Sequence, residues 1–385
     1  MNIAINTIVT PINTKIGVGV YIDNLIENLL REYPEHQFFG IVSSSQSSFH
    51  YDFENYNTIA FSAKPQPSAL LALWQPAFSR SLRSIQSDIY HLPNTSPLFV
   101  HGCPTVASIH DLQEFKIRKY SLLRTVYRRL ANYQMSRRAD LILTLSNSSK
   151  QDIVQILGVD PSKVRVVYLA CSDNYRRLDK QDAKRYIWDK FSVKDYLITV
   201  GDIQPGKNLV RLIEAYARLR GKGERRQLVL IGKERKRYSQ LHNMIRKLNL
   251  DDHVKFTGYV SQEDLVYFYN AAHLCIFPSL YEGFGLPILE AMACGVPVAA
   301  SNISSIPEVA GEAAALFDPY QVEDMVAKIE QIINAPSTLD RMVELGKHQV
   351  GGFSWQRTAI ETMEAYEYVA EQKRSSKNSN SRSPG

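Results

Sequence analysis

Two acidic residues on either side of a glycine-rich turn form the most distinctive chemical pattern in this sequence. Glu282 and Glu290 stand eight positions apart, and Gly283 and Gly285 lie between them. Glycines let backbone N–H groups approach a ligand closely, and N–H groups at the start of a helix favour an anion. An ionised carboxylate accepts hydrogen bonds from paired hydroxyl groups. The pattern therefore predicts a site for a diphosphate, with the two acids holding hydroxyl groups beside it.

The residues around these acids predict the elements that carry them. Residues 274–278 are expected to form a strand, Pro287 is suited to the first turn of a helix, and Gly295 stops that helix. Glu282 then lies on the loop, and Glu290 lies one turn into the helix. The same spacing also fits an ordinary helix start with two exposed acids, so that alternative stays open.

Two other segments carry candidate groups. His110 and Asp111 directly follow the apolar run 105–109, so the histidine side chain is expected to project beyond the end of a strand. A histidine can change its charge near neutral pH, although a lone histidine is more often structural. Gly17 and Gly19 are weaker candidates, and their expected use is to let a diphosphate or an acceptor approach the backbone of the first loop.

These residues must be positioned by parallel sheets. Short apolar runs rich in Val and Ile recur, and each is followed by a segment of helix length, which is typical of βαβ units. The first series of strands is predicted at residues 3–9, 38–43, 88–92, 105–109, 140–145 and 164–169. The second series is predicted at residues 196–200, 227–231, 254–257, 274–278, 296–300 and 314–317.

The length of the chain and the gap between the two series predict two α/β domains. A chain of 385 residues is too long for one ordinary hydrophobic core. We therefore expect two doubly wound, Rossmann-like parallel sheets that face each other across a cleft, with ligands beyond the carboxyl ends of the strands. The predicted parts are an N-terminal domain (1–175), a connection (176–194), a C-terminal domain (195–350), a terminal helix that crosses back (351–371) and a disordered tail (372–385).

The composition excludes several classes of protein. Hydrophobic residues make up 44% and charged residues 22%, as in a globular chain. No apolar run is long enough for a spanning helix, and the N-terminus lacks the basic region of a signal peptide, so we expect a cytoplasmic protein. The cysteines show no CxxC spacing, and we expect buried free thiols and no metal site; they are Cys103, Cys171, Cys275 and Cys294.

A basic run from residue 116 to residue 138 contains eight lysines and arginines and no acidic residue. Four residues of the run share the apolar face of a predicted amphipathic helix: Leu122, Val126, Leu130 and Tyr133. Core packing of this face is the slightly favoured interpretation, and contact with an anionic membrane surface is the alternative. The interleaved tyrosines also suggest nucleic acid, but no recognised binding module is present, so we expect none to bind.

Several segments together resemble glycosyltransferase family 4, the large retaining group with the two-domain GT-B architecture. The segment EGFGLPILEAMACGVPV (282–298) is similar to the donor-site signature of that family. Other segments resemble further motifs of the family: KIGVGVY (15–21), SIHDLQEF (108–115), TLSNSSKQDIVQILGVDPSKVRVVYLA (144–170) and VGDIQPGKNL (200–209). The motifs stand in the right order and span nearly the whole chain, which makes the resemblance specific.

The resemblance implies a role for each candidate residue. The C-terminal domain would bind the donor, where Glu282 would contact hydroxyls of the transferred sugar, Glu290 would hold the ribose diol and Lys207 would neutralise the diphosphate. His110, in the acceptor-binding N-terminal domain, would lie near the reacting carbon or the 6-position of the sugar and help to position it. The other donor-binding residues implied are Gly17, Gly19, Gly201, Gly283, Phe284, Gly285 and Leu286.

One departure from the family pattern concerns the phosphate-binding loop. The family usually places an arginine just after the first glycine or just before the lysine, where this sequence has Asp202 and Gly206. Lys207 would then work with a cation from elsewhere, for which Lys233 and Arg235 are candidates. Otherwise the donor would be turned over more weakly than in relatives.

The function that the resemblance implies is retaining transfer of a hexose, with a mannose-like sugar favoured. The donor would be GDP- or UDP-linked, and the acceptor a glycan or a lipid-linked sugar in the synthesis of cell-surface polysaccharide or glycolipid. The acceptor would attack the face that the leaving group departs from, and the departing phosphate would help to deprotonate it, without a metal or other cofactor. We expect a cytoplasmic enzyme, and the basic run leaves peripheral contact at the inner membrane face open as an alternative. A nucleotide-sugar isomerase of the same architecture and a non-catalytic polyanion-binding protein are the alternatives.

Overall fold

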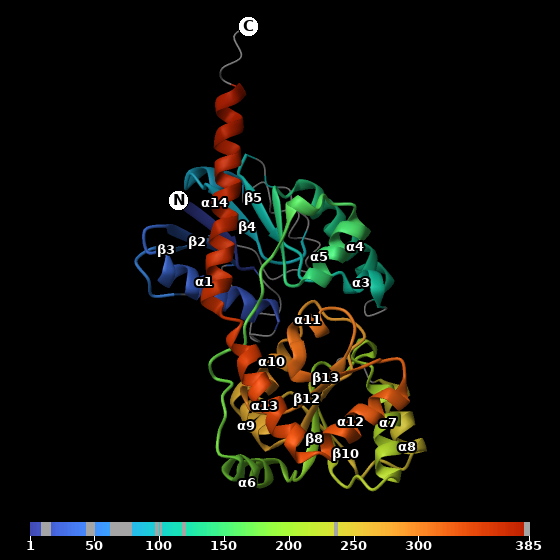
Figure 1. The fold of residues 1–385 in the computed structure, drawn as a ribbon. Helices are drawn as coiled ribbons and strands as arrows, with labels where there is room; N and C mark the ends of the chain where they lie inside the picture. Colours follow the sequence, from blue (N-terminus) through green and yellow to red (C-terminus); the bar gives the residue numbers. More distant parts are fainter. Residues whose placement is uncertain are drawn as a thin grey trace. The chain divides into compact units, whose positions relative to one another are not determined.

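The computed structural model describes residues 1–8, 17–43, 51–61, 79–96, 100, 102–117, 121–234 and 238–380. The chain divides into two compact units, each built on one parallel sheet (Figure 1). The first unit comprises Met1–Phe115, Tyr120–Leu169 and Ser354–Gly385, and the second is built from Ala170–Phe353.

The first unit contains a seven-stranded sheet in the order β3-β2-β1-β4-β5-β6-β7, with parallel pairing throughout. Its strands are β1 (Asn2–Asn6), β2 (Gln37–Ser43), β3 (Tyr56–Phe61), β4 (Ile89–Leu92), β5 (Thr105–Ser108), β6 (Leu141–Thr144) and β7 (Val164–Val166). The strand order reverses between β1 and β4. In a doubly wound sheet, such a reversal opens a crevice at the carboxyl ends of the two strands, where ligands bind.

Helices pack on this sheet through apolar residues at helical spacing. The described helices of the first unit include α1 (Val18–Glu32), α3 (Gln113–Lys116), α4 (Leu122–Arg138), α5 (Asn147–Leu157), the 3-10 turn η2 (Pro161–Lys163) and α14 (Trp355–Asn380). In α1, Ile22, Leu25 and Leu29 are completely buried, because residues three to four positions apart fall on one face of a helix. This face anchors the first helix after β1.

The second unit contains a six-stranded parallel sheet in the order β10-β9-β8-β11-β12-β13. Its strands are β8 (Tyr196–Val200), β9 (Gln227–Ile231), β10 (Val254–Gly258), β11 (Leu274–Phe277), β12 (Val298–Ser301) and β13 (Ala314–Phe317). All residues of β11 and β12 are buried, as expected for strands covered on both faces. Here the strand order reverses between β8 and β11.

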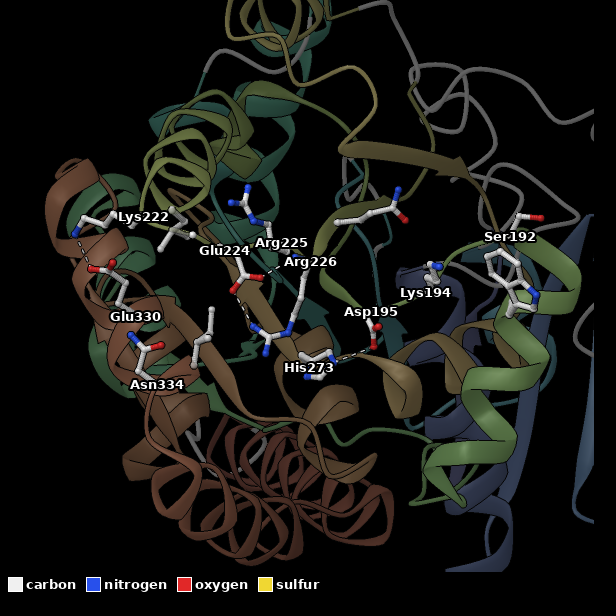
Figure 2. A pocket seen from close by; sticks show the side chains of 15 residues that line it. Ser192, Lys194, Asp195, Lys222, Glu224, Arg225, Arg226, His273, Glu330 and Asn334 are labelled. Carbon is white, nitrogen blue, oxygen red and sulfur yellow. Dashed lines mark hydrogen bonds and ion pairs between the residues drawn. The ribbon is translucent and has the colours of Figure 1, made fainter.

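The helices of the second unit follow the strands as crossover connections. They are α6 (Lys180–Phe191), η3 (Pro205–Lys207), α7 (Leu209–Gly221), α8 (Ser239–Lys247), α9 (Gln262–Ala271), α10 (Leu286–Ala293), α11 (Ile306–Ala310), η4 (Gly311–Ala313), α12 (Val322–Ile333) and α13 (Pro336–Gly351). Helix α6 lies in the stretch expected to connect the domains, and it packs on α9. The amino ends of β8, β9 and β11 border an open groove, which the last turns of α6, α7 and α12 also line (Figure 2).

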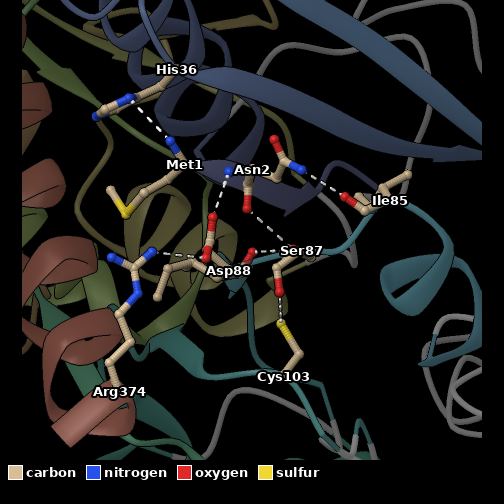
Figure 3. A network of polar contacts seen from close by, with 9 residues as sticks. Met1, Asn2, His36, Ile85, Ser87, Asp88, Cys103 and Arg374 are labelled. Atoms are coloured by element: carbon tan, nitrogen blue, oxygen red, sulfur yellow. Dashed lines mark hydrogen bonds and ion pairs between the residues drawn. The ribbon is translucent and has the colours of Figure 1, made fainter.

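The terminal helix α14 packs on α1 and contacts β4, β5 and β6 of the first unit. The fully buried Tyr366 lies with its hydroxyl 2.7 Å from Nδ1 of His91 in β4, and burial lowers the pKa of this histidine to about 3. Farther along the helix, Arg374 pairs with Asp88 at 3.2 Å, and Asp88 also accepts the backbone N–H of Asn2 (Figure 3). These contacts hold the helix against the amino edge of the sheet.

The tail predicted to be disordered from residue 372 is helical in the structure, and α14 continues to Asn380. Two ion pairs with the amino edge of the first sheet account for the difference: Lys373 with Asp140 at 2.9 Å, and Arg374 with Asp88. The composition of the tail shows its polarity but not these partners, which come from distant parts of the chain. Residues 381–385 of the predicted tail lie outside the described residues.

The α/β class and the doubly wound sheets predicted from the sequence are confirmed, and each predicted strand is present with ends shifted by a few residues. The sequence does not predict β3, whose run YNTIAF is short and partly polar. Among the described strands, this one is at the edge of the first sheet and pairs with β2. An edge strand needs less apolar sequence than a central one, so the pattern that identifies the others is weak here.

Across the part of the chain that the structure describes, no helix combines the length and the apolar character needed to cross a bilayer. Within the same residues, no group of three or more His, Cys, Asp and Glu side chains has the geometry to hold a metal ion. The four cysteines are free thiols; Cys275 and Cys294 are buried, and Cys103 and Cys171 are partly buried.

Candidate active site

A lysine and a glutamate meet where the second sheet reverses its strand order. Lys207 Nζ lies 2.6 Å from Glu282 Oε1, and the two side chains are only 15% and 18% exposed. Lys207 comes from the loop after β8 and Glu282 from the loop after β11, so the ion pair joins the two loops at the reversal. The ammonium group also lies 4.8 Å from the centre of the Phe277 ring. The structure therefore places this pair at the edge where doubly wound sheets bind ligands.

Two glycines shape the lysine loop. A Cβ atom on Gly201, whose φ is +143°, would lie 2.8 Å from Lys207 Cε. A Cβ atom on Gly232, whose φ is +148°, would lie 2.1 Å from the carbonyl oxygen of Gly201. Only glycines permit this approach, so Gly232 lets the turn after β9 reach the lysine loop and Gly201 lets the lysine fold over it. Gly232 was not a candidate in the sequence, although a glycine just after a predicted strand signals close backbone approach.

Two serines hold the acidic loop in place. Ser304 donates to the carbonyl oxygen of Glu282 at 2.7 Å, and Ser305 donates to the carbonyl oxygen of Phe284 at 2.7 Å. The carbonyl groups of Glu282 and Phe284 share their peptide bonds with the N–H groups of Gly283 and Gly285. In a trans peptide the N–H group points away from the carbonyl group, so these two N–H groups face away from the serines. The serines belong to the segment SNISSIPE, but no spacing in the sequence marks them as partners of this loop.

The glycine loop leads directly into α10. Gly285 occupies the N-cap position with φ of +113°, Leu286 is the first helical residue and Pro287 lies in the first turn, as predicted. The first turn of a helix leaves N–H groups without helical partners, and its dipole favours negative charge. The loop and the helix start can therefore receive an anionic group next to Lys207.

Glu290 lies on α10, partly buried, and two tyrosines surround its carboxyl group. Tyr269 donates to Glu290 Oε2 at 3.0 Å, and Tyr175 is a second hydrogen-bond partner. Burial raises the pKa of Glu290 to about 7, against the lowering effects of both tyrosines and of the Lys207 charge. Both tyrosines are far from Glu290 in the sequence, so no local pattern shows them. The structure thus excludes the alternative of an exposed acid at this position.

His110 belongs to the first unit and follows β5, as the sequence predicts. Its Nε2 lies 2.7 Å from the carbonyl oxygen of Pro93, just beyond β4. A carbonyl can only accept, so Nε2 carries a proton and Nδ1 is left as the acceptor. Burial lowers the pKa of His110, so the ring is neutral at pH 7, and the ring of Tyr21 contacts it edge-on with centroids 4.8 Å apart. The histidine is therefore held as a neutral group near the strand-order reversal of the first sheet.

Gly17 and Gly19 both lie where α1 begins. Gly17 is the N-cap residue with φ of +59°, and Gly19 is buried in the first turn. The glycine motif is therefore partly a helix start rather than a loop alone. Lys15, at the beginning of the same motif, lies outside the described residues.

Lys233 and Arg235 are the candidates for a second cation beside Lys207. Lys233 is exposed on the turn after β9, and its carbonyl oxygen accepts the N–H of Ile203 from the lysine loop at 3.1 Å. The turn that carries Lys233 is therefore joined to the loop that carries Lys207. The other candidate, Arg235, lies outside the described residues.

Comparison with known proteins places these features in a family. Residues 16–172 match the profile of Glycosyltransferase Family 4, and residues 180–349 match that of Glycosyl transferases group 1. The chain is also 33% identical over 295 residues to O-antigen chain mannosyltransferase B of Escherichia coli, an alignment that covers 75% of this chain and 76% of the relative. The chain belongs to glycosyltransferase family 4.

Solved structures show the fold of this glycosyltransferase. Sucrose-phosphate synthase from Thermosynechococcus elongatus superposes with a TM-score of 0.76 at 20% identity, covering 96% of this chain and 98% of that one. HepE of Anabaena, in complex with UDP and glucose, superposes with a TM-score of 0.71 at 17% identity, covering 96% of this chain and 100% of that one. At such identities the likeness shows the fold alone. The predicted GT-B architecture is thereby confirmed.

The geometry of the lysine loop leads to a first test of this glycosyltransferase. We expect Gly201→Ala to lower the rate of glycosyl transfer about tenfold, because the new methyl group displaces the flexible end of Lys207. The unusual φ adds strain, which we expect to lower the free energy of unfolding by about 1–3 kcal/mol. Steady-state kinetics and chemical denaturation measure the two effects.

Gly221→Ala is the matched control. Gly221 ends α7, and no atom lies within 4 Å of the position of its added Cβ. We expect this variant to keep both the rate and the stability of the parent. If Gly201→Ala is folded and fully active, the position of the Lys207 side chain over the loop does not matter for catalysis.

Proposed function

We propose that this glycosyltransferase moves a hexose, with mannose the favoured sugar, from a nucleotide diphosphate donor to a glycan or lipid-linked acceptor, with retention of anomeric configuration. The observation that carries the proposal is the Lys207–Glu282 pair, which joins the two loops at the reversal of the second sheet. Lys207 supplies a cation that can bind a diphosphate, and Glu282 beside it supplies an acceptor for the hydroxyl groups of a sugar. A nucleotide sugar presents these two chemistries next to each other.

The chemical roles follow from the charges. Lys207 and the N–H groups at the start of α10 stabilise the negative charge that grows on the leaving diphosphate. Glu282 accepts hydrogen bonds from the sugar, and Glu290 accepts them from the ribose diol. Donor binding therefore turns the contact between Lys207 and Glu282 into contacts with the ligand.

The retaining step is proposed to take place on one face of the sugar. The bond between the anomeric carbon and the diphosphate oxygen breaks, and the bond to the acceptor oxygen forms on the same face. The proton of the acceptor hydroxyl passes to an oxygen of the departing phosphate, which balances the charge that the leaving group has gained. His110, kept neutral by its burial and held in place by its hydrogen bond to the carbonyl oxygen of Pro93, positions the sugar. Addition of EDTA should leave the rate unchanged, because lysine and backbone N–H groups supply the stabilising charge.

The choice of sugar and acceptor rests on relatives. The Escherichia coli relative is an O-antigen chain mannosyltransferase, which supports mannose as the sugar and a bacterial surface polysaccharide as the product. The structure of HepE with UDP and glucose supports a nucleotide-linked donor without selecting the base. We therefore place GDP-mannose first among donors and UDP-linked hexoses second.

A donor screen tests the proposed function. The purified chain is incubated with GDP-mannose or UDP-linked hexoses and a mannose-terminated oligosaccharide or lipid-linked acceptor, and released nucleotide is measured. We expect release that depends on the acceptor and a product whose anomeric NMR signals match those of the donor. An inverted product would overturn retention. A rearranged sugar nucleotide formed without an acceptor would establish the isomerase instead, and no turnover together with binding of polyanions would favour the non-catalytic alternative.

Helix α4 supports a membrane contact of the first unit. The favoured prediction that its apolar face packs into the core is wrong, because the residues that α4 buries are Ala131, Asn132, Met135 and Ser136. The apolar residues of the predicted face are exposed, together with their neighbour Leu123: Leu122 79%, Leu123 85%, Val126 47%, Leu130 63% and Tyr133 39%. We propose that this exposed apolar face inserts into an anionic membrane surface, with the exposed Arg124 of the same helix at the lipid headgroups.

Vesicle flotation tests the membrane contact. We expect the protein to float with vesicles of phosphatidylglycerol and phosphatidylethanolamine at low salt, and replacement of Leu122, Leu123 and Leu130 by serine to weaken binding at least about tenfold. The fold should survive, because the core does not contain these side chains. Tyr259→Ser is the matched control, since Tyr259 is 62% exposed in the second unit. Equal flotation of the triple variant and the parent would remove α4 from the proposal.

A further inference from the structure

A concave surface lies on the second unit, at the amino edge of its sheet. We call it the amino-edge groove; it is lined by the residues at the amino ends of β8, β9 and β11 and by the last turns of α6, α7 and α12. Its volume of about 870 Å³ is large enough for a ligand of several rings. Lys207 and Glu282 follow the carboxyl ends of β8 and β11, so the length of a five-residue strand, about 17 Å, separates the two places. The groove is therefore not part of the candidate active site.

The charges of the groove are largely paired with each other. Arg226 Nη1 lies 2.7 Å from Glu224 Oε2, and Lys222 Nζ lies 2.7 Å from Glu330 Oε2. A binding site for a phosphate or a polyanion would present cations that carboxylates of the same groove do not neutralise. With Lys194, Arg225 and Asp195 included, the lining has four cations and three carboxylates, a formal net charge of +1. Such a surface is rich in donors and acceptors with little net charge, which favours a neutral polar ligand.

The centre of the groove adds an acceptor and a neutral ring. Asp195 Oδ1 lies 3.4 Å from Lys184 Nζ and 3.4 Å from His273 Nε2. Burial raises the pKa of Asp195, but the hydrogen bond from His273 and the charge of Lys184 outweigh it and hold the pKa below its ordinary value. Burial and the charge of Arg226 lower the pKa of His273, so its ring is neutral at pH 7. A carboxylate and an imidazole at this spacing suit ligand hydroxyl groups, which both donate and accept.

An indole ring stands at one end of the groove. Trp188 is 49% exposed, and its contact in the described structure is the ammonium group of Lys194, 5.5 Å from the ring centre. Helix α6 packs on the second unit through Ala183 and Ile187, which are completely buried, and about half of the Trp188 surface remains open to a ligand. The apolar C–H face of a sugar ring stacks on an aromatic ring of this kind. The hydroxyl groups of the sugar then reach the carboxylates and amides beside it.

The groove is elongated rather than round. In Figure 2, Ser192 and Lys194 lie at one end and Glu330 and Asn334 at the other, with Asp195 between them. A single sugar ring would leave most of this length empty. A linear chain of several sugars would contact the aromatic end and the polar end together.

We propose that the amino-edge groove binds a segment of a neutral oligosaccharide, several sugar rings long, without catalysing a reaction on it. That this segment belongs to the acceptor or product glycan rests on the proposed function. A chain held here keeps its growing end near the enzyme between rounds of transfer, so the groove raises the local concentration of acceptor. The consequence is longer products at a given enzyme concentration.

Binding of linear mannose oligosaccharides of two to eight residues to the full chain, measured by calorimetry, tests the groove. We expect affinity to rise with the length of the oligosaccharide. Trp188→Ala and Asn334→Ala should each weaken binding of the longest oligosaccharide at least about tenfold, because they remove contacts at the aromatic end and at the polar end that only a long chain makes together. Tyr259→Ala, which removes an exposed aromatic outside the groove, should bind like the parent.

Two comparisons separate the groove from the active site. Lys207→Met should keep its affinity for the oligosaccharide, and Trp188→Ala should keep its rate with a short soluble acceptor while giving shorter polymer products. The protein could bind the oligosaccharide through Trp188 and yet transfer no sugar. That result would contradict the proposed function but support the oligosaccharide site in the groove. Sugar transfer without oligosaccharide binding, or binding only of inorganic pyrophosphate or heparin, would contradict the proposed oligosaccharide site. It would not contradict the proposed enzymatic function.

Discussion

Lys207→Met lowers the rate constant for glycosyl transfer about 100-fold to 1,000-fold, as expected for loss of one fixed group that stabilises the charge of a transition state. The effect should fall on kcat more than on the KM for the donor, because the charge of the diphosphate is largest when the glycosidic bond is breaking. Steady-state kinetics with the donor that the screen identifies, followed by nucleotide release, measures both constants. Lys207→Arg should recover part of the loss, because it returns a cation with different geometry.

A double variant distinguishes catalysis from stability in this prediction. Lys207→Met leaves Glu282 without its ion-pair partner in a position only 18% exposed, so we expect the free energy of unfolding to fall by about 1–3 kcal/mol. Adding Glu282→Gln removes the unpaired charge and should restore stability but not activity. Lys233→Met is the charge control, because this lysine is exposed on the adjoining turn. If Lys233→Met costs as much activity as Lys207→Met, the diphosphate depends equally on a second cation.

Glu290→Gln weakens binding of the nucleotide about 10-fold to 100-fold and at the same time stabilises the free protein near pH 8. The first effect follows because hydrogen bonds to a charged acceptor contribute about 1.5–3 kcal/mol, and the variant replaces the carboxylate by a neutral amide. The second follows because burial raises the pKa of Glu290 from 4.5 to about 7. An ionised Glu290 therefore destabilises the folded state, and the neutral glutamine of the variant removes this destabilisation.

The pH dependence carries a definite sign. Between pH 4.5 and about pH 7, the folded protein holds the Glu290 proton more tightly than the unfolded chain does, so the free energy of unfolding decreases as pH rises through this window. At pH 8 we expect Glu290→Gln to exceed the parent in free energy of unfolding by about 1–3 kcal/mol, and at pH 5 the difference should vanish. Denaturation at both pH values and calorimetric titration with GDP and UDP measure stability and binding.

Glu344→Gln is the matched control for Glu290. Glu344 is exposed on α13 of the same unit, so its substitution should leave both the free energy of unfolding and the nucleotide affinity as in the parent. If Glu290→Gln and Glu344→Gln behave alike in both measurements, ionisation of Glu290 does not lower the free energy of unfolding and Glu290 does not bind the ribose.

The sequence is informative about the site wherever chemistry depends on neighbours along the chain. The glycine loop, the start of α10 and Glu290 one turn into it follow from local spacing, because helix and turn preferences act over a few residues. The place of His110 after β5 follows in the same way. The roles of these residues in donor binding stay predictions until the variants are measured.

Contacts between distant segments are not visible in the sequence. Nothing in the spacing of Lys207 and Glu282 shows that they meet, and the tyrosines that surround Glu290 come from two other parts of the second unit. The same limit applies to the amino-edge groove, which gathers residues from three strand ends and three helix ends. Helix α4 shows the limit for surfaces, because an apolar stripe has the same pattern whether it faces a core or solvent.

The amino-acid pattern alone indicated the class of fold, the positions along the chain of all described strands but β3 and, through its motifs, the family of the enzyme, because periodicity and local motifs are properties of consecutive residues. Folding was needed to pair Lys207 with Glu282, to expose the apolar face of α4 and to continue α14 past Glu371 through its ion pairs. Each of these depends on which distant groups become neighbours. In a parallel sheet, that depends on the order of the strands in space rather than along the chain.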